Sequence, residues 1–300
     1  MDGRPIGMFD SGFGGLTVAR ALIDLAPHED LVYVGDTGRY PYGPRDLDEV
    51  RSFALQIARW LVDEVDVKLI VVACNTASAA GLDTLQASLP VPVLGVIEPG
   101  VRALARATRN RRVGVVGTVG TIRSGAYQRA FGALPVPLEL VAASCPGFVE
   151  FVERGETRSD QVSVLAERLL APVRDAGVDA LLLGCTHYPF LARTIADVMG
   201  RDVVLVSSAD ETAFEVRAIL ATAGIGRHPG DAPGTMRVFS SGDVRWFGTV
   251  GSRLFGGALG EVEGLTWPTP PPVPATDAGS TPAPTLSAGA RRARRGAASV

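Results

Sequence analysis

Two cysteines stand in equivalent settings in the two halves of this 300-residue sequence. Cys74 follows the apolar run Leu-Ile-Val-Val-Ala and precedes Asn-Thr, whereas Cys185 follows Leu-Leu-Leu-Gly and precedes Thr-His. Apolar runs of this length, rich in branched residues, predict buried strands. Ligands of an open α/β sheet collect beyond the carboxyl ends of its strands, so both thiols are predicted to face a ligand site.

The residues after each cysteine favour the start of a helix. N-capping side chains follow Cys74, and a proline suited to a first helical turn follows Cys185. These residues are Asn75, Thr76 and Ser78 in the first case, and Thr186, His187 and Pro189 in the second. Free N–H groups and the positive end of a helix dipole would then face each sulfur. We expect this setting to lower the pKa of both thiols and to make a thiolate accessible near neutral pH.

Two such thiols could move protons on opposite faces of one carbon atom. Inverting a carbon centre requires that a weakly acidic hydrogen leave from one face and that another arrive from the other. One thiolate can remove the proton while the second thiol delivers one, and the two states exchange with each turnover. The ordinary pKa of cysteine, about 8.5, needs only a modest decrease for this role.

Other roles for the cysteines are weaker hypotheses. Cys145 precedes Pro-Gly without polar neighbours and is expected to be a small buried apolar residue. A zinc site is disfavoured because the chain has three histidines and no Cys-x-x-Cys pair. A cysteine that forms a covalent intermediate would leave the second one unexplained.

Two loops are further candidates for a site. The turn Asp-Ser-Gly-Phe-Gly-Gly at residues 10–15 lacks the lysine of a P-loop, and Thr17 replaces the third glycine of a dinucleotide fingerprint. Asp10 is instead placed to bind an ammonium group or to shuttle a proton, although capping the next helix is an equally good role. The loop at residues 35–44 has two tyrosines and an arginine, which suit either recognition or a rigid connection.

Alternating apolar strands and segments of helical period predict an α/β protein with mainly parallel sheets flanked by helices. Strands are predicted at Ile6–Phe9, Leu31–Gly35, Leu69–Ala73, Val93–Val96, Val113–Val116, Ala180–Leu183 and Val203–Val206. Helices are predicted at Leu47–Glu64, Ala103–Thr108, Val162–Ala176 and Glu211–Ala223.

The sequence is also weakly duplicated. Val-Asp precedes both cysteine-bearing strands, and an apolar strand that runs into a small-residue turn begins near residue 6 and again near residue 113. The matched placement predicts two related α/β halves rather than a chance likeness between βα units. We assign residues 1–97 and 210–267 to the first α/β domain and residues 98–209 to the second.

Composition limits the remaining possibilities. A net charge of −3 and a pI near 5.7 give no global basic field that would attract nucleic acid. The start of the chain has no signal-peptide pattern, and no apolar run is long enough to span a membrane. Three cysteines argue against a disulfide framework and favour a reducing cytoplasm.

The last segment, residues 268–300, is rich in proline and alanine and is predicted to be a disordered tail. Four arginines between positions 291 and 295, set against Asp277, give it a charge of +3, so the rest of the chain carries −6. The arginine cluster is interpreted as solvated, and contact with nucleic acid is the less favoured alternative.

Five separated motifs resemble those of bacterial glutamate racemases. They are Asp10-Ser-Gly-Phe-Gly-Gly, Gly35-Asp-Thr with Pro41-Tyr42-Gly43, Ala73-Cys-Asn-Thr-Ala-Ser, Cys145-Pro146 and Gly184-Cys-Thr-His-Tyr-Pro, in order between residue 5 and about residue 225. The resemblance implies two α/β domains that face each other across the active site, a homodimer, and neither pyridoxal phosphate nor metal. It also implies interconversion of L- and D-glutamate, which supplies D-glutamate for peptidoglycan.

The same resemblance implies roles for individual residues. Cys74 would be the acid/base for the D enantiomer with Asp10 assisting it, and Cys185 the one for the L enantiomer with His187 assisting it. A supporting glutamate corresponds to Glu153 or Glu150. Substrate contacts would come from Asp10, Ser11, Tyr42, Gly43, Asn75, Thr76, Thr186 and His187, with Thr118 and Thr121 near the side-chain carboxylate.

Two alternatives differ in kind from this hypothesis. A racemase that acts on aspartate or a hydantoin would use the same acid/base pair, and only the resemblance selects glutamate. A regulatory protein could instead use the fold or its basic tail to contact nucleic acid or a topoisomerase. Deletion of residues 268–300 distinguishes them, because an enzyme should keep its turnover whereas a tail-mediated contact should vanish.

Overall fold

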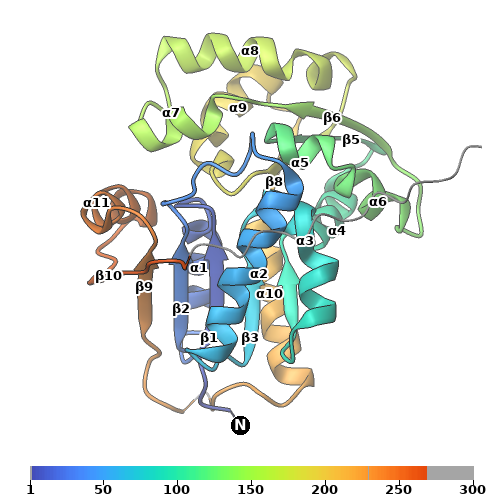
Figure 1. The fold of residues 1–300 in the computed structure, drawn as a ribbon. Coiled ribbons are helices and arrows are strands. Elements are labelled where there is room, and N and C mark those ends of the chain that lie inside the picture. Colours follow the sequence, from blue (N-terminus) through green and yellow to red (C-terminus); the bar gives the residue numbers. More distant parts are fainter. Residues whose placement is uncertain (1, 229, 269–300) are drawn as a thin grey trace, which may run out of the picture. The chain divides into compact units, whose positions relative to one another are not determined.

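Two parallel β-sheets organise the chain (Figure 1). The computed structural model describes residues 2–228 and 230–268, and the part up to Thr266 forms one compact unit. Residues 269–300, which include the predicted tail's arginine cluster, lie outside the described residues. Among those described, none of the helices combines the length and apolar character that a bilayer span requires.

The first sheet has six strands in the order β10-β9-β2-β1-β3-β4, and the second has four in the order β6-β5-β7-β8. The first contains β1 (Ile6–Asp10), β2 (Leu31–Gly35), β3 (Leu69–Val72), β4 (Val93–Gly95), β9 (Met236–Ser240) and β10 (Val262–Gly264). The second contains β5 (Arg112–Gly117), β6 (Glu139–Ser144), β7 (Ala180–Gly184) and β8 (Val204–Ser207). All neighbouring strands are parallel, so the carboxyl ends of each sheet share one edge.

Helices connect and cover these strands. They are α1 (Leu16–Leu25), α2 (Leu47–Asp63), α3 (Asn75–Ser88), α4 (Ile97–Ala107), α5 (Val119–Arg123), α6 (Ala126–Gly132), α7 (Phe148–Arg154), α8 (Asp160–Asp175), the 3₁₀ helix η1 (Tyr188–Leu191), α9 (Ala192–Met199), α10 (Ser208–Thr222) and α11 (Val244–Phe255). Strands β1, β3 and β7 are buried along their whole length, as expected for parallel strands that helices cover on both faces.

The predicted α/β class is confirmed. Each of the seven predicted strands is present, with ends shifted by at most one residue. Three strands were not predicted: β6 is a largely half-exposed edge strand, Arg237 interrupts the apolar run of β9, and β10 has three residues. Helix α4 begins six residues before the predicted Ala103, because Pro99 lies in its first turn, where a missing N–H costs nothing.

The predicted domain boundaries stay a prediction. Strands of the first sheet come from residues 6–95 and 236–264, and those of the second from residues 112–207. Each sheet has its own core: Met8, Tyr33 and Val71 belong to one, and Val116 and Leu183 to the other. We call these parts the first and second lobe.

Candidate active site

The carboxyl ends of strands from both lobes border one small cavity of about 110 Å³. This volume suits a small molecule and is well below the range for drug-sized ligands. The cavity is lined by most of the residues predicted to contact substrate or to transfer protons, but not by Thr121: the lining residues are Asp10, Ser11, Tyr42, Gly43, Cys74, Asn75, Thr76, Cys185, Thr186 and His187. Thr118 and Glu150 line it as well.

Cys74 ends the segment after β3 and is itself the N-cap of α3. Its backbone is extended, and its sulfur accepts a hydrogen bond from the N–H of Ala77 at 3.5 Å. The expectation that Asn75, Thr76 or Ser78 would cap this helix was wrong, because all three lie within α3, which starts immediately after the strand. The Ser78 hydroxyl instead donates to the Val72 carbonyl at 3.1 Å.

The expected decrease in the pKa of Cys74 is also corrected. Burial raises the pKa of this thiol well above its ordinary value, and the negative charge of Asp10 raises it further. The N–H groups of Ala77 and Ser11 act in the predicted direction but are outweighed. Only 5% of Cys74 is exposed, so its thiolate would lack the water that stabilises a charge. Cys74 is therefore protonated in the resting protein.

Cys185 has a different neighbour. Its sulfur lies 4.0 Å from Nδ1 of His187, and Nε2 of that histidine lies 3.0 Å from Oε1 of Glu153. Burial by itself would lower the pKa of His187, but the hydrogen bonds to Cys185 and Glu153 and the charge of Asp10 raise it to about 10. His187 is therefore a buried cation beside Cys185 at neutral pH. Of the two glutamates considered, Glu153 is the one in contact with His187.

Asp10 stabilises the turn that follows β1 with one carboxylate oxygen, and its other oxygen has no hydrogen-bond partner in the described part of the chain. Its Oδ2 accepts hydrogen bonds from the N–H groups of Gly12 and Gly15, each at 3.1 Å. Burial raises the pKa of the carboxyl, opposed by the charge of His187 and by these two N–H donors. Both roles predicted for Asp10 are thus compatible, since one oxygen holds the turn while the other faces the cavity.

A cluster of threonine hydroxyls joins the lobes beside the thiols. Oγ1 of Thr76 lies 3.0 Å from that of Thr118 and 3.1 Å from that of Thr121, and the last two are 2.9 Å apart. Nδ2 of Asn75 donates to the hydroxyl of Tyr127 at 2.9 Å. Tyr127 was not predicted, because it comes from α6 and has no motif around it. The cluster offers hydroxyl donors to a carboxylate.

The loop between β2 and α2 closes the cavity from the first lobe. The Tyr42 hydroxyl donates to the buried carboxylate of Asp36, which also accepts from Nε of Arg39 at 2.7 Å and from Oγ of Ser241 at 2.6 Å. The Gly43 carbonyl accepts from the N–H of Gly120 in the second lobe at 2.8 Å. Asp36 therefore fixes a loop that sequence reasoning left open between recognition and connection.

Three buried polar atoms that face the cavity have no hydrogen-bond partner within the described part of the chain. They are Oδ1 of Asp10, Oδ1 of Asn75 and the hydroxyl of Tyr40. A buried polar group without a partner costs about 1–3 kcal/mol. Two acceptors and a hydroxyl therefore point at a space that a polar ligand with donor groups would fill. Tyr40 is one of the two tyrosines noted in the loop at residues 35–44, although no role was assigned to it.

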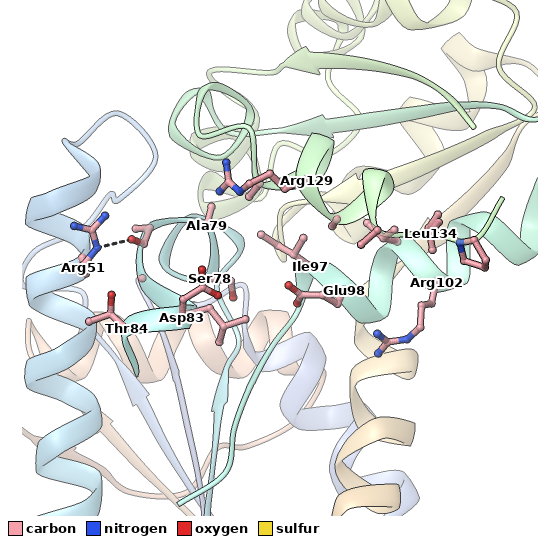
Figure 2. A pocket seen from close by; sticks show the side chains of 18 residues that line it. Arg51, Ser78, Ala79, Asp83, Thr84, Ile97, Glu98, Arg102, Arg129 and Leu134 are labelled. Carbon is pink, nitrogen blue, oxygen red and sulfur yellow. Dashed lines mark hydrogen bonds between the residues drawn. The ribbon is translucent and has the colours of Figure 1, made fainter. Parts of the chain in front are cut away.

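A larger cavity of about 690 Å³ lies between α3, α4 and α6 (Figure 2). Charges of both signs surround it, from Arg51, Arg102, Arg129, Asp83 and Glu98. Figure 2 shows Arg51 bonded to a carbonyl, that of Ala80, at 2.8 Å. No cysteine or histidine lines this cavity, so the smaller one is the candidate active site.

Comparisons with known proteins agree with this geometry. Residues 16–215 match the sequence profile of the family described as Asp/Glu/Hydantoin racemase. A curated glutamate racemase from Acidothermus cellulolyticus is 49% identical over 265 residues, which cover 88% of this chain and 100% of that protein. The chain therefore belongs to the Asp/Glu/hydantoin racemase family. Racemases are isomerases.

Solved structures point to the same branch of the family. A glutamate racemase from Bacillus anthracis gives a TM-score of 0.85 at 40% identity and covers 89% of this chain and 99% of its own. Another from Francisella tularensis, solved in complex with D-glutamate, gives 0.82 at 32% identity and covers 89% and 98%. The resemblance inferred from the five motifs is thereby confirmed.

Proposed function

We propose that this protein is a glutamate racemase that uses Cys74 and Cys185 as its two bases. One observation carries the proposal: thiols that follow strands of two different sheets border the same small cavity, together with most of the predicted substrate residues. The similarity to glutamate racemases at about half identical residues supports glutamate over aspartate or a hydantoin. Neither alternative is favoured by a feature of the site.

The two thiols have different charged neighbours. Cys74 holds its proton because burial and Asp10 raise its pKa. The Cys185 sulfur lies 4.0 Å from Nδ1 of His187, whose pKa is raised to about 10, and a cation beside a sulfur favours proton removal by that sulfur. In the proposed reaction of L-glutamate, the Cys185 sulfur removes the α-proton from one face, and the Cys74 thiol delivers its proton to the other. D-glutamate leaves behind a Cys74 thiolate and a Cys185 thiol.

The reverse reaction needs the opposite pair of states. The Cys74 thiolate then removes the α-proton of D-glutamate, and the Cys185 thiol returns a proton to the other face. Asp10, whose pKa is raised, can hold a proton near Cys74 while the states are reset. Protons are conserved in both directions, since one leaves the substrate and one enters it in each turnover.

Substrate binding follows from the unpaired atoms and the hydroxyl cluster. The free oxygens of Asp10 and Asn75 accept hydrogen bonds from the ammonium group. The first N–H groups of α3 and the Thr76–Thr118–Thr121 hydroxyls donate to carboxylate oxygens, which spread charge as the α-carbon loses its proton. Burial of the site keeps these interactions strong.

The wider role is part of the same proposal. A glutamate racemase supplies D-glutamate for peptidoglycan synthesis and so supports cell-wall biogenesis and cell shape. We expect the enzyme to act in the cytoplasm, as a homodimer and without a cofactor. The nucleic-acid or topoisomerase contact has no supporting feature among the described residues.

Circular dichroism tests the activity directly. Purified protein without added cofactor should reduce the signal of L-glutamate to zero, as the mixture approaches equal amounts of both enantiomers. Aspartate treated in parallel should keep its signal. Racemisation of aspartate instead of glutamate, or of neither, would contradict the proposed substrate.

A further inference from the structure

Helix α11 of the first lobe contacts the second lobe near the C-terminus of the helix. Arg253, in the last turn of α11, donates from Nη2 to the backbone carbonyl of Glu153 at 2.5 Å. Its neighbour Leu254 packs against the cores of both lobes. Figure 1 shows α11 close to α7, the short helix that carries Glu153. A residue a hundred positions away in sequence therefore contacts the glutamate that holds His187.

The Glu153 carbonyl needs this donor because α7 ends there. The last carbonyls of a helix have no partner within it. Two are satisfied locally: the N–H of Gly155 donates to Val152, and that of Glu156 donates to Phe151. The Glu153 carbonyl receives Arg253 instead, whose positive charge also suits the negative end of the helix dipole.

Gly155 makes room for the guanidinium. Its φ of +80° is in the left-handed region that favours glycine, and a Cβ there would lie 3.0 Å from Nη1 of Arg253. The guanidinium thus lies against the bare backbone of the α7 cap. A side chain at this position would push it away from the Glu153 carbonyl.

The two ends of Glu153 have separate partners. Its backbone carbonyl is held by Arg253, and its carboxylate lies 3.0 Å from Nε2 of His187. The imidazole in turn lies beside Cys185. Arg253 therefore holds the backbone of the residue whose carboxylate contacts this imidazole.

We propose that Arg253 is a positioning residue that holds Glu153 in contact with His187 and so maintains Cys185 as the base for L-glutamate. This inference rests on the proposed racemase function. Arg253 does not line the cavity, so it acts through Glu153 and not on the substrate.

The test must use isotope exchange. The two enantiomers have equal free energy in water, so kcat/KM is the same in both directions for every active variant. A defect on one side of the site therefore lowers racemisation equally from L and from D. Exchange of the α-hydrogen without inversion escapes this constraint, because the thiol on the substrate's own side removes the α-proton, exchanges it for a deuteron from the water and returns that deuteron.

The experiment compares Arg253→Met with Arg245→Met and Arg253→Lys in deuterated water. Arg245 is an exposed arginine near the start of the same helix. In Arg253→Met, we expect racemisation and exchange from L-glutamate to fall about tenfold, while exchange from D-glutamate stays within about twofold of wild type. Arg245→Met should match wild type, and Arg253→Lys should recover most of the loss because its ammonium can still donate to the carbonyl.

Two results would overturn the inference. One is equal loss of exchange from both enantiomers in Arg253→Met, which would mean a general structural role. The other is unchanged exchange from both, with thermal unfolding midpoints like those of wild type. If the wild-type protein exchanged the α-hydrogen of neither enantiomer, the racemase function itself would be refuted. The wild-type measurement therefore separates failure of the proposed function from failure of the inference about Arg253. If Arg253→Met does not fold, Arg253→Gln gives the same comparison.

Discussion

The two sides of the cavity use unlike surroundings for the same side chain. Cys74 lies at the N-terminus of α3 beside a carboxyl, Asp10, and keeps its proton. Cys185 lies beside a histidine whose pKa is raised by its hydrogen bonds to Cys185 and Glu153. A reaction that inverts a carbon centre requires one base and one acid at any moment. The two thiols are buried alike, so the difference between the lobes teaches that neighbouring charges distinguish them.

Loss of one thiol should have the largest effect and isolate each side. Cys185→Ser should lower racemisation by about 10³-fold or more, because serine is a poor base at neutral pH. Exchange from D-glutamate should persist, while exchange from L-glutamate is suppressed. Cys74→Ser should give the opposite pattern, measured by the deuterium content of each enantiomer. Equal exchange from both enantiomers in either variant would refute the assignment of one thiol to each.

A smaller effect is expected where the environment of Cys74 is changed. Asp10→Asn removes the negative charge that raises the pKa of Cys74, so this pKa should fall. Racemisation should decrease by about 10²-fold, because the amide cannot hold a proton for the thiol and binds an ammonium group less well. Thiol reactivity toward iodoacetamide, followed against pH, measures the change. A reactivity profile unchanged from wild type would show that Asp10 does not control Cys74.

On the other side, Glu153→Gln should weaken the cation beside Cys185. The folded-state pKa of His187, about 10, lies above its ordinary value of 6.5. Its contribution to stability is therefore complete below about pH 6.5 and is lost as the pH rises through about 10. The groups that face His187 are Cys185, Glu153 and Asp10.

Removing the Glu153 charge should lower the pKa of His187, so that both stability and activity decline at a lower pH than in wild type. We expect about a tenfold loss of racemisation at pH 8. Thermal unfolding midpoints between pH 6 and 10.5 and a rate profile over the same range measure both effects. Glu150→Gln is the matched control, and an equal shift in that variant would contradict the assignment of Glu153.

The smallest expected effect concerns the tail. Deletion of residues 269–300 should leave kcat and KM for glutamate within about twofold of wild type, because every residue of the candidate site precedes it. Steady-state kinetics of the truncated protein provide the measurement. A large loss would mean that the tail contributes to the site or to assembly.

The local sequence was sufficient to identify the two thiols as candidate bases, but it did not predict the raised pKa of Cys74. Cys74 and Cys185 were recognisable because strand, polar pair and helix start lie within a few residues of each other. The raised pKa of Cys74 depends on burial, which comes from elements distant in sequence. Tyr127 and Arg253 were missed for the same reason, since their contacts are made only where the two lobes meet.

The same division applies to the fold. Central strands can be predicted from unbroken apolar runs, as in β3 and β7. Edge strand β6 is half exposed, and the three residues of β10 are held in place mainly by pairing with β9. Contacts with adjacent strands determine the conformation of β6 and β10, so their local sequence patterns do not predict it.

Burial of both thiols has a consequence for successive turnovers. Cys74 and Cys185 are 5% and 6% exposed, so water has little access to either sulfur. In the proposed mechanism, the enzyme that has just released D-glutamate is in the state that accepts D-glutamate, and it must be reset before it accepts L-glutamate. The protonation states of the two thiols thus depend on which enantiomer was released last. At high substrate concentration, the proton transfer that resets these states should limit the turnover rate.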